Sequence, residues 1–328
     1  MRAGIRITEY GGVEIPDRLL GRRVALRHRV GERDGRSLFS DAVGELSADD
    51  PATVLVSTRR GPVRVARAAV VAVRAVPAAV PRRASWAAVA RLEGLCADAW
   101  PAPVDRPLGG WRLRAAGGFT GRANAALAVG DPGRPVAEAL RVVGAFAAEH
   151  GIPPRAHAPL GSPWERAISD QGWVLEVEHA AGPESAVLVA PLEGTADPRV
   201  ELTARPAAEW WRLGPGDPPT PDQRAVVDPG PPARTAFPLV RASDGAAVGH
   251  LRAAVVEDHL HLALLAVAEP ARRRGLGRAL VATAAAWGRD RGARWAVLQV
   301  AVHNTAALAF YQRIGFREHH RYRYLVPP

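Results

Sequence analysis

A basic, glycine-containing segment after a predicted strand most constrains how this chain folds. Residues 268–281 read AEPARRRGLGRALV, so three arginines and two glycines separate an apolar run ending at Val267 from an alanine- and leucine-rich run. The pattern predicts a strand, a tight corner and a helix that begins near Leu276. A helix N-terminus offers unpaired N–H groups and the positive end of its dipole, so the corner is predicted to bind an anion such as a diphosphate.

Two familiar phosphate-binding loops do not match this corner. A Walker A loop needs a Gly-Lys pair, and none of the 328 residues is a lysine. The dinucleotide-binding fingerprint needs a third glycine three residues after Gly277, where the chain has Leu280. The remaining pattern, Arg272-x-x-Gly275-x-Gly277 directly after a strand, resembles the acyl-CoA loop of the GNAT superfamily of N-acetyltransferases.

A second segment, HNTAALAFYQRIGF at residues 303–316, resembles the other signature of that superfamily. It has an asparagine at the predicted helix start, then small residues, a tyrosine and a Gly-Phe pair. Asn304, Ala307 and Tyr311 are three and four residues apart, so they share one helical face. The two signatures, each after a predicted strand, imply a GNAT fold for residues 199–328, with acetyl-CoA as co-substrate and no metal.

The resemblance also implies how acetyl-CoA is held. The backbone N–H groups of the corner are expected to bind the diphosphate, the arginine side chains to add charge, and the end of the preceding strand to pair with the pantetheine amides. The cofactor-binding residues predicted in this way are Leu265, Ala266, Val267, Arg272, Arg273, Arg274, Gly275, Leu276, Gly277, Arg278, Asn304 and Ala307.

Acetyl transfer to an amine needs a neutral nucleophile, an oxyanion donor and an acid for the departing thiolate. The resemblance assigns the acid role to Tyr311 and the oxyanion contact to backbone N–H groups near Val267. His261 is a candidate base, because a histidine near its ordinary pKa of about 6.5 accepts a proton at neutral pH. Strand alternation places it on the same face as Ala263, Leu265 and Val267. Glu257 and a water molecule are the alternative bases.

Two further segments precede the predicted catalytic domain. Residues 1–77 contain short alternating runs of valine and arginine and predict a small SH3-like β-barrel. Residues 84–196 predict an α+β domain with the element order of a second, degenerate GNAT-like domain, so the fold class is α/β (α+β). Its nearest approaches to the acyl-CoA loop have an aromatic residue in place of the second glycine: Arg106-x-x-Gly109-x-Trp111 and Arg114-x-x-Gly117-x-Phe119.

The high positive charge is weak evidence for a nucleic-acid partner. The net charge is +10 and the pI about 11.0, but all 43 basic residues are arginine, which is typical of a high-GC genome when alanine, glycine and proline are also abundant. Residues 1–83 contain 16 arginines and 9 acidic residues, a local excess of 7. They contain few aromatic residues for base stacking, so contact with nucleic acid stays an alternative for this segment.

The rest of the composition predicts a cytoplasmic protein. A lone cysteine, Cys96, excludes a disulfide framework, and no apolar run approaches the roughly 20 residues that cross a bilayer. The N-terminus lacks the apolar core of a signal peptide.

Together these features predict an enzyme that transfers the acetyl group of acetyl-CoA to a primary amine by direct attack in a ternary complex. The acceptor is a small molecule or a peptide, and residues 210–234 are expected to wall its pocket. Two alternatives are a mycothiol-synthase-like tandem acetyltransferase and a non-catalytic acyl-CoA sensor whose basic barrel binds nucleic acid or protein.

Overall fold

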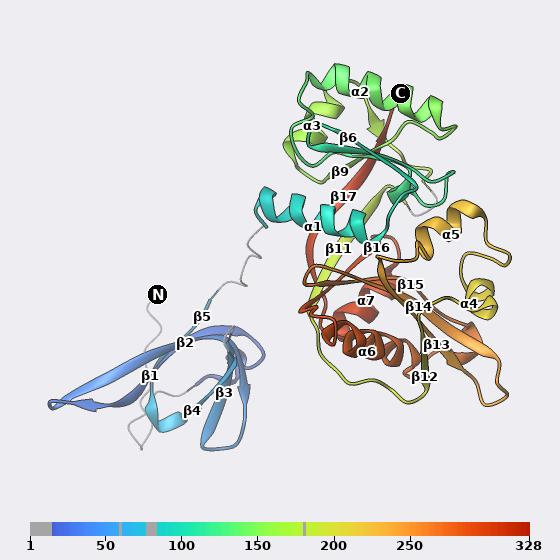
Figure 1. Cartoon of the computed structure of the whole chain (residues 1–328). Coiled ribbons are helices and arrows are strands. Elements are labelled where there is room, and N and C mark those ends of the chain that lie inside the picture. Colours follow the sequence, from blue (N-terminus) through green and yellow to red (C-terminus); the bar gives the residue numbers. More distant parts are fainter. Residues whose placement is uncertain (1–14, 59–60, 77–83, 180–181) are drawn as a thin grey trace. The chain divides into compact units, whose positions relative to one another are not determined.

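The computed structural model describes residues 15–58, 61–76, 84–179 and 182–328. The chain divides into two compact units, residues 1–82 and 83–328 (Figure 1). The first unit is one antiparallel sheet in the order β4-β3-β2-β1-β5. Its elements are η1 (Asp17–Leu19), β1 (Arg23–Arg33), β2 (Arg36–Ala48), β3 (Thr53–Thr58), β4 (Gly61–Ala66), η2 (Arg67–Ala69) and β5 (Val70–Ala75).

The alternation of buried and exposed side chains along the strands explains the core of this small sheet. Val24 and Leu26 on β1, and Val54 and Val56 on β3, are fully buried, while the residues between them are more exposed. Each strand therefore contributes one apolar face, as the period of two predicts. The strand β2 was not assigned from the sequence, because its run SLFSDAVGELSA mixes polar and apolar residues less regularly.

The second unit is built on one large mixed sheet with helices on both faces. Its elements are α1 (Trp86–Ala99), β6 (Val104–Leu108), β7 (Trp111–Ala115), η3 (Gly121–Ala123), β8 (Ala126–Leu127), α2 (Val136–Glu149), β9 (Ala156–Pro159), α3 (Pro163–Ser169), β10 (Val174–Leu175), β11 (Glu184–Pro191), β12 (Val200–Thr203), α4 (Ala208–Leu213), α5 (Pro221–Val227), β13 (Arg234–Arg241), β14 (Ala247–Val256), β15 (His259–Val267), η4 (Glu269–Ala271), α6 (Leu276–Arg289), β16 (Trp295–Ala301), α7 (Thr305–Arg313) and β17 (Arg317–Val326).

The sheet runs in the order β12-β13-β14-β15-β16-β11-β17-β9-β8-β7-β6, and β10 pairs with β17. Within the described residues two neighbouring pairs are parallel, β8 with β9 and β15 with β16. A helix connects the strands of each parallel pair, α2 in the first and α6 in the second. The unit therefore contains two βαβ connections, each with a strand-to-helix corner.

Two strands join the halves of this sheet. The strand β11 lies between β16 and β17, although it comes before β12 in the chain. The C-terminal strand β17 pairs with β11 over its first part and with β9 and β10 over its last part, so the red β17 runs in among the green elements in Figure 1. The sheet is thus continuous across residues 196–199, where the sequence predicts a domain boundary.

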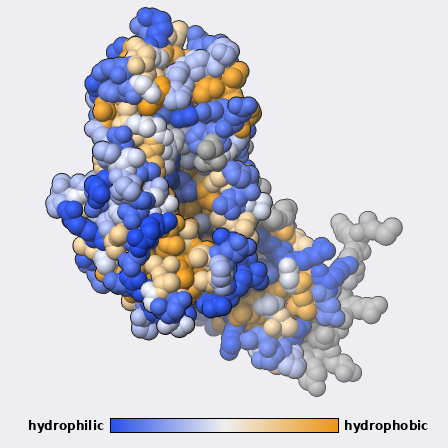
Figure 2. All heavy atoms as spheres, turned by 90° about the vertical axis from the view of Figure 1, so that its right-hand side faces the viewer, coloured by the Kyte–Doolittle hydropathy of each residue, from blue (hydrophilic) through white to orange (hydrophobic). Residues whose placement is uncertain are grey.

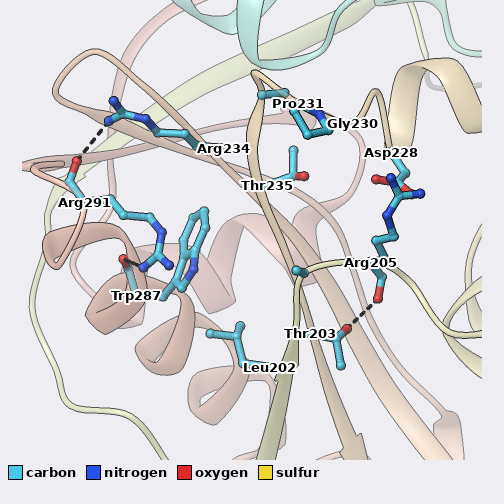
Figure 3. Close-up of a pocket in the computed structure, with 12 residues that line it drawn as sticks. Leu202, Thr203, Arg205, Asp228, Gly230, Pro231, Arg234, Thr235, Trp287 and Arg291 are labelled. Carbon is cyan, nitrogen blue, oxygen red and sulfur yellow. Dashed lines mark hydrogen bonds and ion pairs between the residues drawn. The ribbon is translucent and has the colours of Figure 1, made fainter.

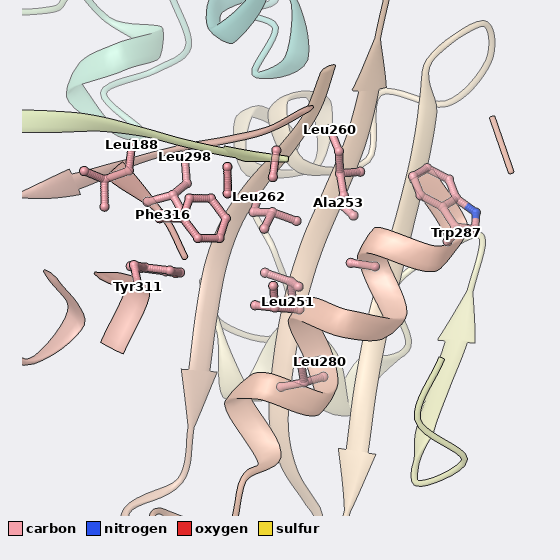
Figure 4. Close-up of a cluster of buried hydrophobic side chains, with 14 of the residues drawn as sticks. Leu188, Leu251, Ala253, Leu260, Leu262, Leu280, Trp287, Leu298, Tyr311 and Phe316 are labelled. Atoms are coloured by element: carbon pink, nitrogen blue, oxygen red, sulfur yellow. The ribbon is translucent and has the colours of Figure 1, made fainter. Parts of the chain in front are cut away.

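Helices cover both faces of the strands β12 to β16. On one face α6 and α7 pack on the strands through a core in which Leu280 and Trp287 point at Leu251 and Leu260, and Tyr311 lies beside Phe316 (Figure 4). On the other face α4 and α5 contribute Trp210, Trp211, Val226 and Val227, and α1 contributes Leu92, Leu95 and Cys96.

The apolar side chains of this unit are mostly internal, and hydrophilic residues cover most of the face in Figure 2. No helix in the described part of the chain is long and apolar enough to cross a membrane.

Candidate active site

The strands β15 and β16 separate at the centre of the sheet. They pair from His259 to Leu262, but from Ala263 to Val267 β15 has no partner strand on that side among the described residues. A β-bulge lies at the same place, since Arg252 of β14 is opposite Ala263 while His250 is opposite Ala266. The bulge holds Leu264 at a φ of 56°, a left-handed conformation that costs roughly 1–3 kcal/mol. A V-shaped gap therefore opens between the two strands, with strained backbone at its edge.

The bulge also changes which face each β15 side chain occupies. Leu265 and Val267 pack toward α6 and α7, whereas Ala263 and Leu264 pack toward α4 and α5. His261 shares the face of Ala263. The prediction that it shares a face with Leu265 and Val267 was wrong, because the extra residue in the bulge breaks the period of two.

At the end of β15, residues 272–278 form what we call the arginine corner. Gly275 is the N-cap of α6 with a φ of 77°, and Arg273 is also left-handed with a φ of 65°. The first helical hydrogen bond runs from the N–H of Ala279 to the carbonyl of Gly275, and the N–H groups of Arg273 to Arg278 have no hydrogen-bond acceptor within the described residues. Consecutive free N–H groups in such a turn form an anion-binding nest.

The arginine side chains of the corner have different roles. The Arg272 side chain donates from Nε to the Val267 carbonyl at 2.9 Å and ties the corner to β15. Arg273 and Arg278, with Arg313 of α7, line a pocket and form no ion pair in the described structure. Three unpaired guanidinium groups around free N–H groups make this pocket strongly favourable for an anion. Arg274 is exposed and does not line it.

We call this cavity of about 710 Å³ the cofactor pocket. Its walls come from the end of β15, the arginine corner and one face of α7. The predicted cofactor-binding residues that line it are Leu265, Ala266, Val267, Arg272, Arg273, Gly275, Leu276, Gly277, Arg278 and Ala307. Asn304 does not line it; its side chain accepts a hydrogen bond from the N–H of Ala307 at 3.1 Å and caps α7. The structure thus brings most of the predicted set around one cavity.

The two glycines of the corner serve different purposes. Nothing lies within 4 Å of a Cβ built on Gly275, so this position faces open space and its backbone is accessible to a ligand. A Cβ on Gly277 would touch the Phe310 ring at 3.4 Å, so Gly277 allows α6 to approach α7. Phe310 and Arg313, which also line the pocket, were not predicted as site residues; their spacing around Tyr311 on α7 was the available signal.

Tyr311 lies at the inner wall of the cofactor pocket. Its side chain is largely buried, and its ring packs edge-on against Phe316 with the centroids 5.5 Å apart. Burial raises the pKa of its phenol well above the usual range, so the hydroxyl stays protonated at neutral pH. A neutral phenol at this place is a proton donor.

The two candidate side-chain bases lie outside the cofactor pocket. His261 is 1% exposed, and burial followed by Arg122 and Arg252 holds its pKa well below its usual range. Glu257 pairs with Arg91 at 2.7 Å and precedes β15, so roughly eight residues or about 26 Å of strand separate it from Leu265. Neither residue is placed to contact a ligand in the cofactor pocket.

A smaller cavity of about 430 Å³ lies at the opposite end of α6 (Figure 3). Arg205 pairs there with Asp228 at 3.7 Å, and Arg291 stacks on Trp287 at 4.5 Å. A helix of this length is about 20 Å long, so this cavity is remote from the arginine corner. The sequence predicts that residues 210–234 wall the acceptor pocket, and part of this segment lines the smaller cavity. Trp210 and Trp211 of the same segment instead pack in one apolar cluster with Ala263 and Leu264.

No cluster of three or more histidine, cysteine, aspartate or glutamate side chains in the described ranges is placed to hold a metal ion.

The sheet order, the gap and the corner define the fold of the GCN5-related N-acetyltransferases, the GNAT superfamily. A solved structure described as "GCN5-related N-acetyltransferase from Kribbella flavida" superimposes with a TM-score of 0.51 and 20% sequence identity, covering 74% of this chain and 94% of that one. The free N–H groups and the arginine side chains of the corner fit the diphosphate of acetyl-CoA, the co-substrate that this fold implies.

Sequence comparison then gives the family. Residues 86–325 match the family described as "Probable histone acetyltransferase Rv0428c C-terminal", and residues 18–74 match "Rv0428c N-terminal Sm-like domain". "Probable histone acetyltransferase Rv0428c" of Mycobacterium tuberculosis is 31% identical over 93% of this chain and 95% of its own length. The "Uncharacterized N-acetyltransferase YobR" of Bacillus subtilis is 26% identical over 71% of this chain and 97% of its own length. The chain belongs to the Rv0428c family and is an acetyl-transferring enzyme.

The matching family describes the first unit as Sm-like rather than SH3-like. The structure shows a small antiparallel sheet there, with no pairing between β4 and β5 among the described residues. The SH3-like barrel stays a prediction.

Proposed function

We propose that this enzyme transfers the acetyl group of acetyl-CoA to a primary amine by direct attack within a ternary complex. The observation that carries the proposal is the position of the open arginine corner at the mouth of the gap between β15 and β16, with Tyr311 on its inner wall. An anion held at the corner directs the rest of an extended ligand along the unpaired edge of β15. The free backbone groups there are available to the pantetheine amides and, near Val267, to the thioester carbonyl.

Acetyl-CoA supplies an activated acetyl group as a thioester. In the proposed step the neutral amine nitrogen forms a C–N bond with the carbonyl carbon as the C–S bond breaks. The Tyr311 hydroxyl donates its proton to the departing sulfur, the extra proton on nitrogen leaves to water, and the Tyr311 phenolate takes a proton back from water, which restores the phenol. His261 is enclosed and Glu257 is remote, so water is the acceptor of that proton in this scheme.

For the acceptor, we propose a lysine side chain in a basic protein segment. The support is the printed name of the Mycobacterium tuberculosis relative, a probable histone acetyltransferase that matches nearly the whole chain. An amino-sugar thiol, which a mycothiol-synthase-like enzyme would use, is the alternative acceptor.

The test is an assay of the full chain with acetyl-CoA and two acceptors, an N-terminally blocked peptide with one lysine between arginines, and an amino sugar. We expect one acetyl group on the lysine peptide by mass spectrometry, with an equal amount of free CoA thiol released. Transfer to the amino sugar alone would favour the alternative, and no transfer to either would contradict the proposal.

A further inference from the structure

A second cavity approaches the gap from the opposite face of the sheet. It has a volume of about 550 Å³ and is lined by Gln299 and Ala301 of β16, which follow the last residue that pairs with β15, Leu298. Leu298 and Val300 pack toward α6 and α7, so Gln299 and Ala301 face the other way. The second cavity therefore lies against β16 at the edge of the gap, on the face of the sheet opposite to the cofactor pocket.

The middle segment of the chain builds the wall of this second cavity. Its lining residues include Gly118, Thr120, Gly121 and Arg122 from the loop after β7, and Arg155, Glu176, Glu178 and His179 around β9 and β10. The buried Asn124 fixes the loop: its Oδ1 accepts from the N–H groups of Ala116 and Gly118, and its Nδ2 donates to the carbonyls of Phe119 and Thr120. A wall held by four hydrogen bonds is preorganised for a ligand.

The sides of the cavity are aromatic and neutral. Tyr324 stacks on His179 with the ring centroids 4.3 Å apart, and Tyr322 lines the same cavity. Burial raises the pKa of both phenols, so neither carries a charge at neutral pH. A Cβ on Gly121 would lie 2.9 Å from the Tyr324 ring, which shows how closely the loop approaches it. Such walls suit an alkyl chain with a cationic end.

An acidic group stands at the outer part of the cavity. Glu176 is neutralised by a two-pronged ion pair with Arg155. Glu178 is exposed and has no ion pair or hydrogen bond in the described structure. Its free carboxylate favours a positively charged group at the mouth of the cavity.

Arg122 lies at the inner part, next to the gap. Its guanidinium donates to the Gln299 side chain at 2.7 Å and lies 4.8 Å from the Trp100 ring centroid, and it forms no ion pair with a described carboxylate. The buried Arg252 lies 5.0 Å from the same ring. An amine beside Gln299 stands on the order of 6 Å from this positive charge, which favours its neutral form over its ammonium form.

We propose that this second cavity, the acceptor cavity, takes a lysine side chain from a basic peptide, with Glu178 attracting the neighbouring positive charges and Arg122 admitting the amine to the gap in its neutral form. The inference rests on the proposed function and adds the site and the two residues that select the substrate. The acceptor cavity is negative at its outer part and positive at its inner part. The outer charge attracts the amine in its ammonium form, and the inner charge favours loss of the proton before the amine attacks.

The first test locates the acceptor without needing turnover. A basic peptide whose lysine carries a photoreactive diazirine is irradiated with the full chain, and the crosslink is mapped by mass spectrometry. We expect crosslinks to residues 118–122 or to Tyr322 and Tyr324. Crosslinks only at the cavity of Figure 3, or none, would overturn the inference; acetylation of lysine peptides is measured separately and decides the proposed function.

The second test removes the negative charge of Glu178 at the outer part of the acceptor cavity. Glu178→Gln should raise KM for a lysine flanked by arginines about 3- to 10-fold at low salt and leave KM for a serine-flanked lysine unchanged. Glu193→Gln is the matched control, because Glu193 is also exposed and has no ion pair with a described residue, but it follows the far end of β11. An equal effect of both variants, or no effect of Glu178→Gln, would contradict the role of Glu178.

The third test removes the positive charge of Arg122 at the inner part of the acceptor cavity. Arg122→Gln should move the midpoint of the pH profile of kcat/KM to higher pH by about one unit, because the amine then keeps its proton longer. Arg122→Lys keeps the positive charge and should keep the original midpoint, which separates the electrostatic effect from lost packing on Trp100. A common midpoint for both variants and the unaltered enzyme would overturn the role of Arg122.

Discussion

Two corners of the second unit join a strand to a helix within a parallel βαβ connection. The arginine corner leads from β15 into α6, and residues 128–135, which we call the filled corner, lead from β8 into α2. At the arginine corner the backbone N–H groups are free and a glycine faces open space. At the filled corner the hairpin between β6 and β7 occupies the same kind of position.

The contacts of that hairpin are direct. The N–H of Gly110 donates to the Asp131 carbonyl at 2.5 Å, and the Trp111 indole donates to the Gly130 carbonyl at 2.8 Å. A Cβ on Gly109 would lie 2.3 Å from the carbonyl carbon of Pro132. The corner therefore has no room for a ligand backbone.

The charges of the filled corner also oppose an anion. The Asp131 side chain accepts from the N–H of Gly133 at 2.8 Å, and Glu138 lies in the first turn of α2. A helix N-terminus alone is thus not a phosphate site; the surrounding chain must leave its N–H groups free and add positive charge. The difference supports the proposal that residues 84–196 form a degenerate half that serves as acceptor wall.

The largest expected effect comes from placing a carboxylate at each corner. Gly275→Glu should lower acetyl-CoA affinity about 1,000-fold, because the side chain fills the nest and repels the diphosphate. Gly133→Glu, at a glycine with a similar φ of 71° in the filled corner, should change the affinity less than about twofold. Isothermal titration of both variants checks this, and comparable losses would erase the distinction between the corners.

The helices that follow the two parallel strand pairs, α7 after β16 and α3 after β9, also differ in whether they carry a tyrosine at the corresponding position. Tyr311 is seven residues after the cap of α7, Asn304, whereas the same offset from Ser162, the cap of α3, gives Ser169. Tyr311→Phe should lower kcat about 100-fold and leave acetyl-CoA affinity unchanged, because only the proton donor is removed. Steady-state kinetics and titration test this; equal losses in kcat and affinity would remove Tyr311 from the acid role.

Adding one methyl group to the hairpin that packs on the filled corner, and one to the arginine corner, tests the packing difference. Gly109→Ala should lower the free energy of unfolding by about 2 kcal/mol or more, because its Cβ meets the backbone of the filled corner. Gly275→Ala meets no atom and costs only the left-handed strain, about 1 kcal/mol. Denaturant unfolding measures both values, and a smaller cost for Gly109→Ala would mean that the hairpin is not tightly seated.

The smallest expected effect is that of single exposed charges. Arg273→Gln or Arg278→Gln should weaken acetyl-CoA binding about 5-fold, less at high salt, since each guanidinium adds to the backbone nest. Arg134→Gln in the filled corner should have no effect on binding. Titrations at two salt concentrations check this, and a salt-independent loss would indicate a packing role for the corner arginines.

Local signals in the sequence predicted much of the arginine corner and its surroundings. The predicted helix from Leu276, the strand before it and the α7 face with Ala307 and Tyr311 are all present. Two short helices, α3 and α5, were not assigned, although Ser162-x-x-Glu165 and Thr220-x-x-Gln223 resemble capping boxes. These helices, strands and caps depend on residues that are close together in the sequence, so the local sequence pattern is enough to predict them.

The features that the sequence did not predict depend on contacts between residues that are far apart in the sequence. The bulge at Leu264 depends on the register of β15 against β14, and it moved His261 to the other face. Arg114, which begins one of the two segments that approach the acyl-CoA loop pattern without matching it, is buried and donates to the carbonyls of Ala97 and Trp100 at the end of α1. The insertion of β11 between β16 and β17, which joins the two halves, has no local signature.

The central claim is that one corner of this chain binds acetyl-CoA and the other does not. The most direct test is the stoichiometry of acetyl-CoA binding to this 328-residue chain, measured by isothermal titration calorimetry. We expect one molecule per chain to bind with micromolar affinity. Two molecules per chain would show that the filled corner opens to a ligand, and no binding would contradict the assignment of the arginine corner.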